Sequence, residues 1–212
     1  MAQTLQYRAV IFDLGGVVLD SPFAAIAAFE REHGIPDGFI NRVIVDTGSA
    51  GAWSKLERGH FSLEEFCGPF ERDCADAGQR LDARALMEQI FGGLEPRPVM
   101  VEAIRRIRAR GLTAAALTNN WRGDRTSELN DHFDCFIESS VVGLHKPDPA
   151  IYQHTCAELG IEPSEAIFLD DIGRNLKSAK ALGMATIKVG DPTEALRELQ
   201  SLLGFPLGID GE

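Results

Sequence analysis

Four short polar stretches in this chain carry side chains that could handle a phosphoryl group. They are Asp13, Thr118-Asn119, Lys146 and Asp170-Asp171. Three carboxylates in one crevice repel one another unless a divalent cation joins them, and hard oxygen ligands favour Mg²⁺ over zinc. A hydroxyl and an amide can hold anionic oxygens, while a lysine supplies positive charge. Together these residue types indicate phosphoryl transfer to an aspartate, a form of covalent catalysis.

The elements that must position these residues are predicted from the hydrophobic pattern. Apolar runs typical of buried strands cover residues 7–12, 112–118, 133–138, 166–169 and 185–189. Amphipathic helices are predicted at 99–110, 124–132, 149–159, 175–182 and 192–203. This alternation predicts an α/β fold with a doubly wound parallel sheet. Since the carboxyl ends of parallel strands open on one edge, the polar stretches should converge there.

A helical insertion separates the first strand from the others. Residues 22–93 show helical periodicity without a convincing strand, with Ser21-Pro22 as one helix start and a capping box from Ser62 to Glu65 as another. We therefore predict a core domain of residues 1–19 and 95–212 and a helical cap of residues 20–94. Aromatic residues of the cap could line an apolar pocket, although their helical spacing favours a plain core. They are Trp53, Phe61, Phe66 and Phe70.

Composition narrows the classes of partner. The chain has 212 residues, 44% of them hydrophobic, which suits one sizeable domain with an insertion. A net charge of -11 argues against nucleic acid and anionic membrane surfaces but allows a small phosphorylated substrate in a locally cationic pocket. The N-terminus lacks a basic region followed by an apolar core, and no apolar run is long enough to span a bilayer, so we expect no signal peptide and no membrane insertion. The four cysteines are scattered and lack zinc-site spacing, which favours reduced thiols and a cytoplasmic protein.

Each polar stretch also has a purely structural interpretation. Thr118-Asn119-Asn120 alone is typical of a loop that caps its own backbone, and the sequence from Lys146 to Pro149 would pass as a solvated turn. Asp170-Asp171 could cap the following helix. All four stretches in this order, each after a predicted strand, favour the functional interpretation.

The same stretches resemble the motifs of the haloacid dehalogenase superfamily, whose members are mostly Mg²⁺-dependent phosphatases. The matching motifs are Phe12 to Val17, Leu117-Thr118-Asn119, Lys146-Pro147 and Phe168 to Asp171. Longer stretches are similar to the N-terminal phosphatase domains of soluble epoxide hydrolases and to the leading domains of acyl-CoA dehydrogenase-family proteins. These stretches are Thr118 to Trp121, Gly143 to Pro149 and Phe168 to Leu176. The likeness runs nearly end to end and is looser in the helical insertion, where that family keeps its cap.

The resemblance implies a role for each matching position around the metal. Asp13 would be the nucleophile and a Mg²⁺ ligand, and the backbone carbonyl of Gly15 would be a second ligand. Asp171 would bind Mg²⁺ directly, with Asp170 acting mainly through water. Asn175, one helical turn further on, would contact these carboxylates without binding the metal itself.

For the phosphate, the resemblance implies that Thr118 and Asn119 hold the phosphoryl oxygens. Lys146 would balance the charge on Asp13 and on the phosphate.

The chain departs from the family at one position. Most phosphatases of this superfamily carry a second aspartate two residues after the nucleophile, which protonates the leaving oxygen; here Gly15 occupies that position. General acid–base catalysis typically contributes ~10²–10⁴-fold, so its loss should leave a slow phosphatase. Another proton donor could act instead, and Asp20 and His145 are the nearest candidates in sequence.

Two other functions stay open at this point. A halide leaves without a proton, so a metal-independent dehalogenase of small 2-haloacids would not miss an acid at Gly15. Such an enzyme gives no reason for the carboxylates at Asp170-Asp171. The third candidate is a module that binds a phosphorylated ligand with little turnover.

Overall fold

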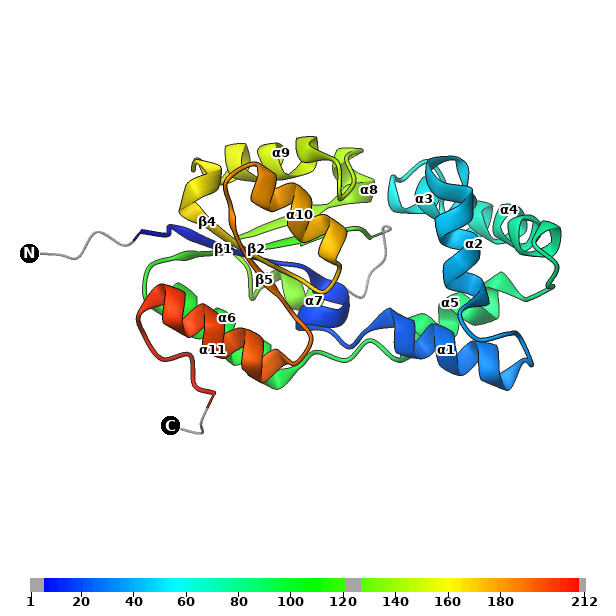
Figure 1. The fold of residues 1–212 in the computed structure, drawn as a ribbon, viewed down its shortest axis with the longest axis horizontal. Coiled ribbons are helices and arrows are strands. Elements are labelled where there is room, and N and C mark those ends of the chain that lie inside the picture. Colours follow the sequence, from blue (N-terminus) through cyan, green and yellow to red (C-terminus); the bar gives the residue numbers. More distant parts are fainter. Residues whose placement is uncertain (1–5, 121–126, 210–212) are drawn as a thin grey trace, which may run out of the picture.

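The protein is built around a five-stranded parallel sheet. The computed structural model describes residues 6–120 and 127–209, and within these the sheet order is β3-β2-β1-β4-β5 (Figure 1). The chain runs outward from β1 to β3, then crosses to the other side for β4 and β5. The bounds of the strands are β1 Ala9–Phe12, β2 Thr113–Thr118, β3 Cys135–Glu138, β4 Ala166–Asp170 and β5 Ala185–Lys188. Strand order reverses beside β1, which places a crevice at the carboxyl ends of β1 and its neighbours.

Helices cover both faces of the sheet, which explains why β1 and β4 are buried throughout. Val10 and Phe12 of β1 pack on one face with α6 (Pro98–Ala109) and α11 (Pro192–Leu203). Ile11 points to the other face, toward α9 (Pro149–Leu159) and α10 (Gly173–Ala181). Successive strand residues point to opposite faces, so a continuous apolar run is what two covered faces require.

The predicted helical insertion packs around an apolar core of its own. It lies beyond one end of the sheet (Figure 1). Its helices are α1 Pro22–Glu32, α2 Phe39–Thr47, α3 Ala52–Glu57, α4 Leu63–Asp76 and α5 Ala83–Gly92, with a short 3₁₀ turn at Gly48–Ala50. We call α1 to α5 the cap.

Two antiparallel segments join the cap to the rest of the molecule. Leu19 and Pro96 form a β-bridge, and the Asp20 amide donates to the Glu95 carbonyl at 3.0 Å. The domain boundaries predicted at residues 20 and 94 would fall here; the division itself stays a prediction.

The cap aromatics belong mainly to its core. Phe66 and Phe70 are 0% and 1% exposed and stack at 4.9 Å between ring centroids, and Trp53 meets Phe66 edge-on. Phe61 is only partly buried, and the Lys55 ammonium lies 5.6 Å from its ring centroid. The core interpretation of these aromatics is therefore correct for Trp53, Phe66 and Phe70.

The observed elements differ from the predicted ones in four places. A helical turn at Leu14–Val18 follows β1, and a short helix, α8 (Ser139–Val142), follows β3; neither was predicted, because Ser and Val are weak helix formers and a buried apolar run suggests a strand. The helix predicted at 124–132 is observed as α7 (Ser127–Asn130), and residues 121–126 lie outside the described residues. A 3₁₀ turn occupies Pro163–Glu165. Within the described residues no helix is long and apolar enough to span a membrane.

Candidate active site

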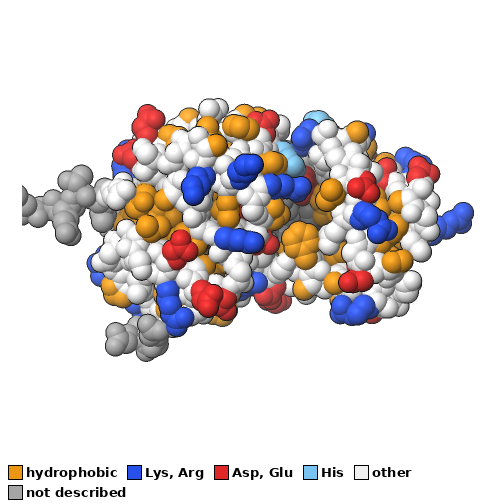
Figure 2. All heavy atoms as spheres, in the orientation of Figure 1, with side chains coloured by type: hydrophobic (Ala, Val, Ile, Leu, Met, Phe, Trp, Pro, Cys, Tyr) orange, Lys and Arg blue, Asp and Glu red, His pale blue; other side chains and the backbone are white. Residues whose placement is uncertain are grey.

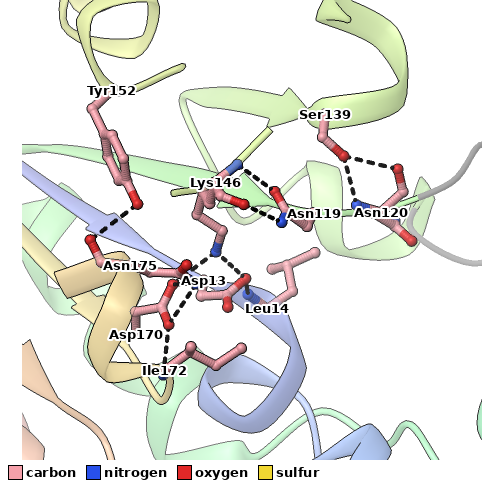
Figure 3. Close-up of polar contacts among 10 residues, drawn as sticks. All are labelled: Asp13, Leu14, Asn119, Asn120, Ser139, Lys146, Tyr152, Asp170, Ile172 and Asn175. Atoms are coloured by element: carbon pink, nitrogen blue, oxygen red, sulfur yellow. Dashed lines mark hydrogen bonds and ion pairs between the residues drawn. The ribbon is translucent and has the colours of Figure 1, made fainter. Parts of the chain in front are cut away.

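Asp13 lies where β1 passes into the helical turn Leu14–Val18. Its amide still donates to the Leu169 carbonyl of β4 at 2.9 Å, so the sheet holds the backbone at this residue. Its carboxylate Oδ1 accepts from the Leu14 amide at 2.7 Å and thereby caps the turn. The side chain is mostly buried, with 7% of Asp13 exposed. Strand and turn together aim the carboxylate toward the Lys146 ammonium at the carboxyl end of β1 (Figure 3).

Lys146 connects two of the carboxylates. Its Nζ lies 2.9 Å from Asp13 Oδ1 and 2.8 Å from Asp170 Oδ2, and its side chain is only 1% exposed. Asn119 fixes the lysine backbone from the end of β2: its Nδ2 donates to the Lys146 carbonyl at 2.9 Å, and its Oδ1 accepts from the Lys146 amide at 2.8 Å. The structure therefore gives Asn119 a role in positioning Lys146 and leaves one side-chain N–H for a phosphoryl oxygen. Thr118 is buried at the last position of β2.

Asp170 is fully occupied by protein groups. Oδ1 accepts from the Ile172 amide at 2.7 Å, Oδ2 accepts from Lys146 at 2.8 Å, and the Asn175 side-chain amide contacts both oxygens at 3.1 and 3.0 Å. The sequence predicted that Asp170 would act mainly through water. In the structure Asp170 is also a direct counter-ion of Lys146, with Asn175 holding its carboxylate, and its contact with a metal through water stays a prediction. Tyr152, which sequence reasoning missed, donates to the Asn175 carbonyl at 3.0 Å and supports this group from α9.

Asp171 differs from Asp170 because one of its oxygens lacks a partner. Its Oδ1 is buried and receives no hydrogen bond, although an unpaired buried carboxylate oxygen is costly. Oxygens of Asp13, Asp170 and Asp171 all lie within 4.8 Å of one another, and in the described part of the chain these three form the one acidic group of metal-binding spacing. A divalent cation bound among these three carboxylates would give that oxygen a partner. The donor set therefore fits Mg²⁺.

Gly16 lets the turn after β1 approach Asp171 closely. Its φ is +77°, a left-handed conformation, and a Cβ at this position would overlap the Asp171 carboxylate. Only glycine satisfies both conditions.

The electrostatics of the site call for another cation. Burial raises the pKa of Asp13 most strongly; Lys146 opposes the rise, Asp170 and Asp171 add to it, and the pKa reaches about 8. Burial lowers the pKa of Lys146, but Asp13 and Asp170 outweigh it, so the pKa rises and the ammonium stays charged. Burial, followed by Asp170, also raises the pKa of Asp171. Three carboxylates share one ammonium group, and a divalent cation would balance the excess negative charge.

The side chains of the two predicted substitutes for the missing acid contact residues other than Asp13, Lys146, Asp170 and Asp171. The Asp20 side chain is 54% exposed and pairs with Arg97, whose Nε lies 3.4 Å from Asp20 Oδ1. Nε2 of His145 lies 2.7 Å from Glu57 Oε2 on the cap helix α3. At Gly15 itself a Cβ would lie 3.2 Å from Cδ of Pro22, the first residue of α1. Sequence reasoning did not find Glu57 of the cap or Ser139, the core residue that contacts the Glu57 backbone. Neither residue lies in a recognisable motif.

The sequence is similar to known proteins along most of its length. The family model described as haloacid dehalogenase-like hydrolase matches residues 7–183. Acyl-CoA dehydrogenase family member 10 of Mus musculus is 40% identical over 95% of this chain. Bifunctional epoxide hydrolase 2 of Sus scrofa is 37% identical over 94% of it. The chain spans 20% and 39% of the lengths of these two relatives. The predicted family resemblance is confirmed.

The fold is also found among solved structures. A HAD family enzyme from Bacteroides thetaiotaomicron, in complex with magnesium and inorganic phosphate, aligns with a TM-score of 0.61 at 21% identity. The alignment covers 87% of this chain and 96% of that one. This likeness confirms the predicted fold class, a parallel α/β sheet of this family.

Proposed function

Because the chain belongs to the haloacid dehalogenase-like hydrolase family, we propose that it is a Mg²⁺-dependent phosphatase that hydrolyses a small phosphomonoester through an aspartyl-phosphate on Asp13. The observation that carries the proposal is the buried cluster in which Lys146 bridges Asp13 and Asp170 while Asp171 keeps an unpartnered oxygen. A divalent cation held by Asp13 and Asp171 would give that buried oxygen a partner, and the proposal rests on this fit.

The proposed nucleophile is Asp13 Oδ2. Oδ1 already accepts from the Leu14 amide and contacts the Lys146 ammonium, whereas no hydrogen bond reaches Oδ2 from the described residues. A bond from this oxygen to phosphorus forms as the bond from phosphorus to the leaving oxygen breaks, and water then releases phosphate from Asp13. Lys146 offsets the negative charge on Asp13 and on the phosphoryl group throughout.

Asp13, Asp171 and the Gly15 carbonyl would hold the metal. Bound Mg²⁺ would supply positive charge against the phosphoryl oxygens. Thr118 and the remaining N–H of Asn119 would bind those oxygens from the end of β2. Asp170 would keep Lys146 in place, since its own oxygens are already occupied.

The proposed substrate is a small phosphorylated molecule, either a sugar phosphate or a lipid phosphate. Despite the net charge of -11, exposed Lys and Arg side chains lie over α10 on the face shown in Figure 2. They are Arg174, Lys177 and Lys180. Because α10 begins two residues after Asp171, these charges would attract an anionic substrate toward the site. Trp53, Phe66 and Phe70 are committed to the cap core, so they do not supply an apolar pocket for a lipid chain.

Gly15 determines how this proposal is best tested. Without a carboxyl at this position, a leaving oxygen receives no proton there, so rates should fall steeply as the leaving group becomes more basic. We would measure kcat/KM with Mg²⁺ on a series from p-nitrophenyl phosphate to alkyl phosphates. Gly15→Asp should raise the alkyl rates by ~10²–10⁴-fold and flatten the series. Gly15→Ala is the matched control, since it makes the same contact with Pro22 without an acid.

One outcome would contradict the role given to Gly15, and another would contradict the phosphatase activity itself. A shallow series that Gly15→Asp leaves unchanged would mean that another group already donates the proton. No turnover across the whole panel, with Mg²⁺ demonstrably bound, would sink the proposed activity and favour a module that only binds phosphorylated ligands.

A metal-independent dehalogenase is the second candidate, because Gly15 would not hinder the loss of a halide. The unpartnered Asp171 oxygen beside Asp13 argues against it, since a metal-free site would gain nothing from that buried charge. Chloride release from 2-chloropropionate in the presence of a chelator would identify this activity; we expect none.

A further inference from the structure

Glu57, at the end of the cap helix α3, contacts two segments of the core. Its Oε2 lies 2.7 Å from Nε2 of His145, and its backbone carbonyl accepts a hydrogen bond from the Ser139 hydroxyl. Its other oxygen, Oε1, accepts from the indole N–H of Trp53 at 3.1 Å. The carboxylate therefore links a buried side chain of the cap to the core. Figure 1 shows α3 facing α8 across the junction between the two parts.

The first contact leads to the catalytic lysine. His145 directly precedes Lys146, and the Lys146 backbone is held on both sides by the Asn119 side chain, at 2.8 and 2.9 Å. A displacement of His145 would therefore move the Lys146 backbone, and with it the buried Nζ that lies between Asp13 and Asp170.

The second contact leads to the loop after β2. The Ser139 hydroxyl that reaches Glu57 also contacts the amide and the carbonyl of Asn120, at 3.0 and 3.2 Å (Figure 3). Asn120 follows Asn119, the residue that holds Lys146. Both sets of contacts therefore lead from Glu57 to Asn119, which follows β2 and holds the backbone of Lys146.

Helix α3 packs closely on α8, and the contact is partly shielded from solvent. Gly59, just beyond α3, has a φ of +72°, and a Cβ there would overlap the Ser140 carbonyl. The His145 and Glu57 side chains are 14% and 18% exposed. Such a pair is screened less by solvent and salt than an exposed one, so its geometry can matter to the residues attached to it.

We propose that Glu57 is a positioning residue that couples the docking of the cap to the assembly of the phosphate site. This inference rests on the proposed phosphatase function. His145 then links the Glu57 carboxylate to the backbone of Lys146. Because Glu57 holds its Nε2, His145 does not replace the acid that is missing at Gly15. Displacement of a catalytic group by ~1 Å can cost ~10²-fold in rate, so a small shift of the Lys146 segment would suffice.

A double-mutant cycle tests the coupling. Glu57→Ala, His145→Ala and the double variant are compared in Mg²⁺-dependent hydrolysis of p-nitrophenyl phosphate. We expect each single variant to lower kcat/KM, mainly through kcat, and the double variant to be little worse than either. Residues in contact couple by about 2- to 150-fold on this scale. Glu88→Ala is the control: it removes an exposed glutamate from the cap helix α5 and should change nothing.

A purely structural role would give a different pattern. If the pair only stabilised the fold, coupling would appear in the melting temperature while kcat/KM per folded molecule stayed at the wild-type value. That result, or additive effects of the two substitutions on kcat/KM, would overturn the proposal.

His145→Gln separates positioning from proton donation. Glutamine can still donate a hydrogen bond to Glu57 but cannot serve as a general acid. Activity within a few-fold of wild type supports positioning, whereas a loss as large as that of His145→Ala overturns it.

Binding measurements keep the inference separate from the proposed function. The wild type, Glu57→Ala, His145→Ala and the double variant are titrated with orthovanadate and Mg²⁺ in a calorimeter. This measurement of binding needs no turnover. Coupled losses of vanadate affinity would support Glu57 as a positioning residue even if the wild type hydrolysed nothing, in which case only the proposed activity would fail. Unchanged vanadate affinity in both single variants would overturn the inference.

Discussion

Replacing Gly16 with alanine should abolish Mg²⁺ binding while leaving the chain folded. A side chain at its φ of +77° costs ~1–2 kcal/mol, as for any non-glycine residue in the left-handed region. The new Cβ would also lie 2.7 Å from Asp171 Cγ, where ordinary contact begins at 3.4 Å. Since Asp171 Oδ2 would lie closer still, the carboxylate must move by at least about 0.7 Å, which the strict octahedral geometry of Mg²⁺ does not tolerate.

Gly34→Ala is the matched control for this substitution. Gly34 has a similar φ of +66°, but a Cβ there would meet nothing within 4 Å. In a chain of this size 1 kcal/mol shifts the melting temperature by ~2–4 °C, so both variants should melt about 2–8 °C lower than wild type in chelator.

Added Mg²⁺ then distinguishes the two variants. Ligand binding to the folded state stabilises it, by ~2.7 kcal/mol at a hundredfold excess over Kd. Wild type and Gly34→Ala should both gain this increment in a thermal melt, and Gly16→Ala should lose it. Calorimetry should likewise show no Mg²⁺ binding by Gly16→Ala at a hundredfold excess over the wild-type Kd, which corresponds to an affinity loss of at least ~100-fold, or ~2.7 kcal/mol. Wild-type Mg²⁺ affinity in Gly16→Ala would refute the assignment of Asp171 as a ligand.

Three further predictions concern stability. In chelator, the free energy of unfolding of the wild type, measured with urea, should fall between about pH 5 and pH 8. In this range the folded state keeps a proton on Asp13, whose pKa is about 8, whereas the unfolded chain has already released it. Asp13→Asn should flatten this slope, and an equally steep slope in that variant would contradict Asp13 as its cause. Glu30, 1% exposed, accepts from the amides of Gly38 and Ile40 at 2.8 and 2.7 Å. Glu30→Gln should therefore lose ~1–3 kcal/mol in thermal melts, whereas the exposed control Glu88→Gln should lose almost nothing. Ser62→Ala removes half of the capping box of α4 and should cost ~0.5–2 kcal/mol, with faster amide exchange in the first turn of that helix; unchanged exchange at Glu65 would contradict it.

The sequence was sufficient to predict the fold and the convergence of the polar side chains at one edge of the sheet. Buried apolar runs bounded by glycine and proline identify the strands, and parallel strands bring their carboxyl ends together whatever the loops do. Helix starts at Ser21-Pro22 and Ser62 were predicted because capping depends on neighbours within a few residues, and both caps are present.

What could not be predicted depends on tertiary packing. The sequence contains Asp170 and Asp171 side by side, but only the structure shows that Asn175 and Lys146 occupy the first and leave the second with a free oxygen. Likewise, Glu57 and His145 are 88 positions apart. Nothing local to either residue signals that α3 will seat on the segment before Lys146.

The most direct test of the central claim is mass spectrometry of the protein after acid quench during steady turnover. We predict a phosphoryl group on the peptide that contains Asp13, formed only when Mg²⁺ is present and absent in Asp13→Asn. Phosphate release without any adduct on that peptide, or an adduct that persists in chelator, would contradict Asp13 as the metal-assisted nucleophile.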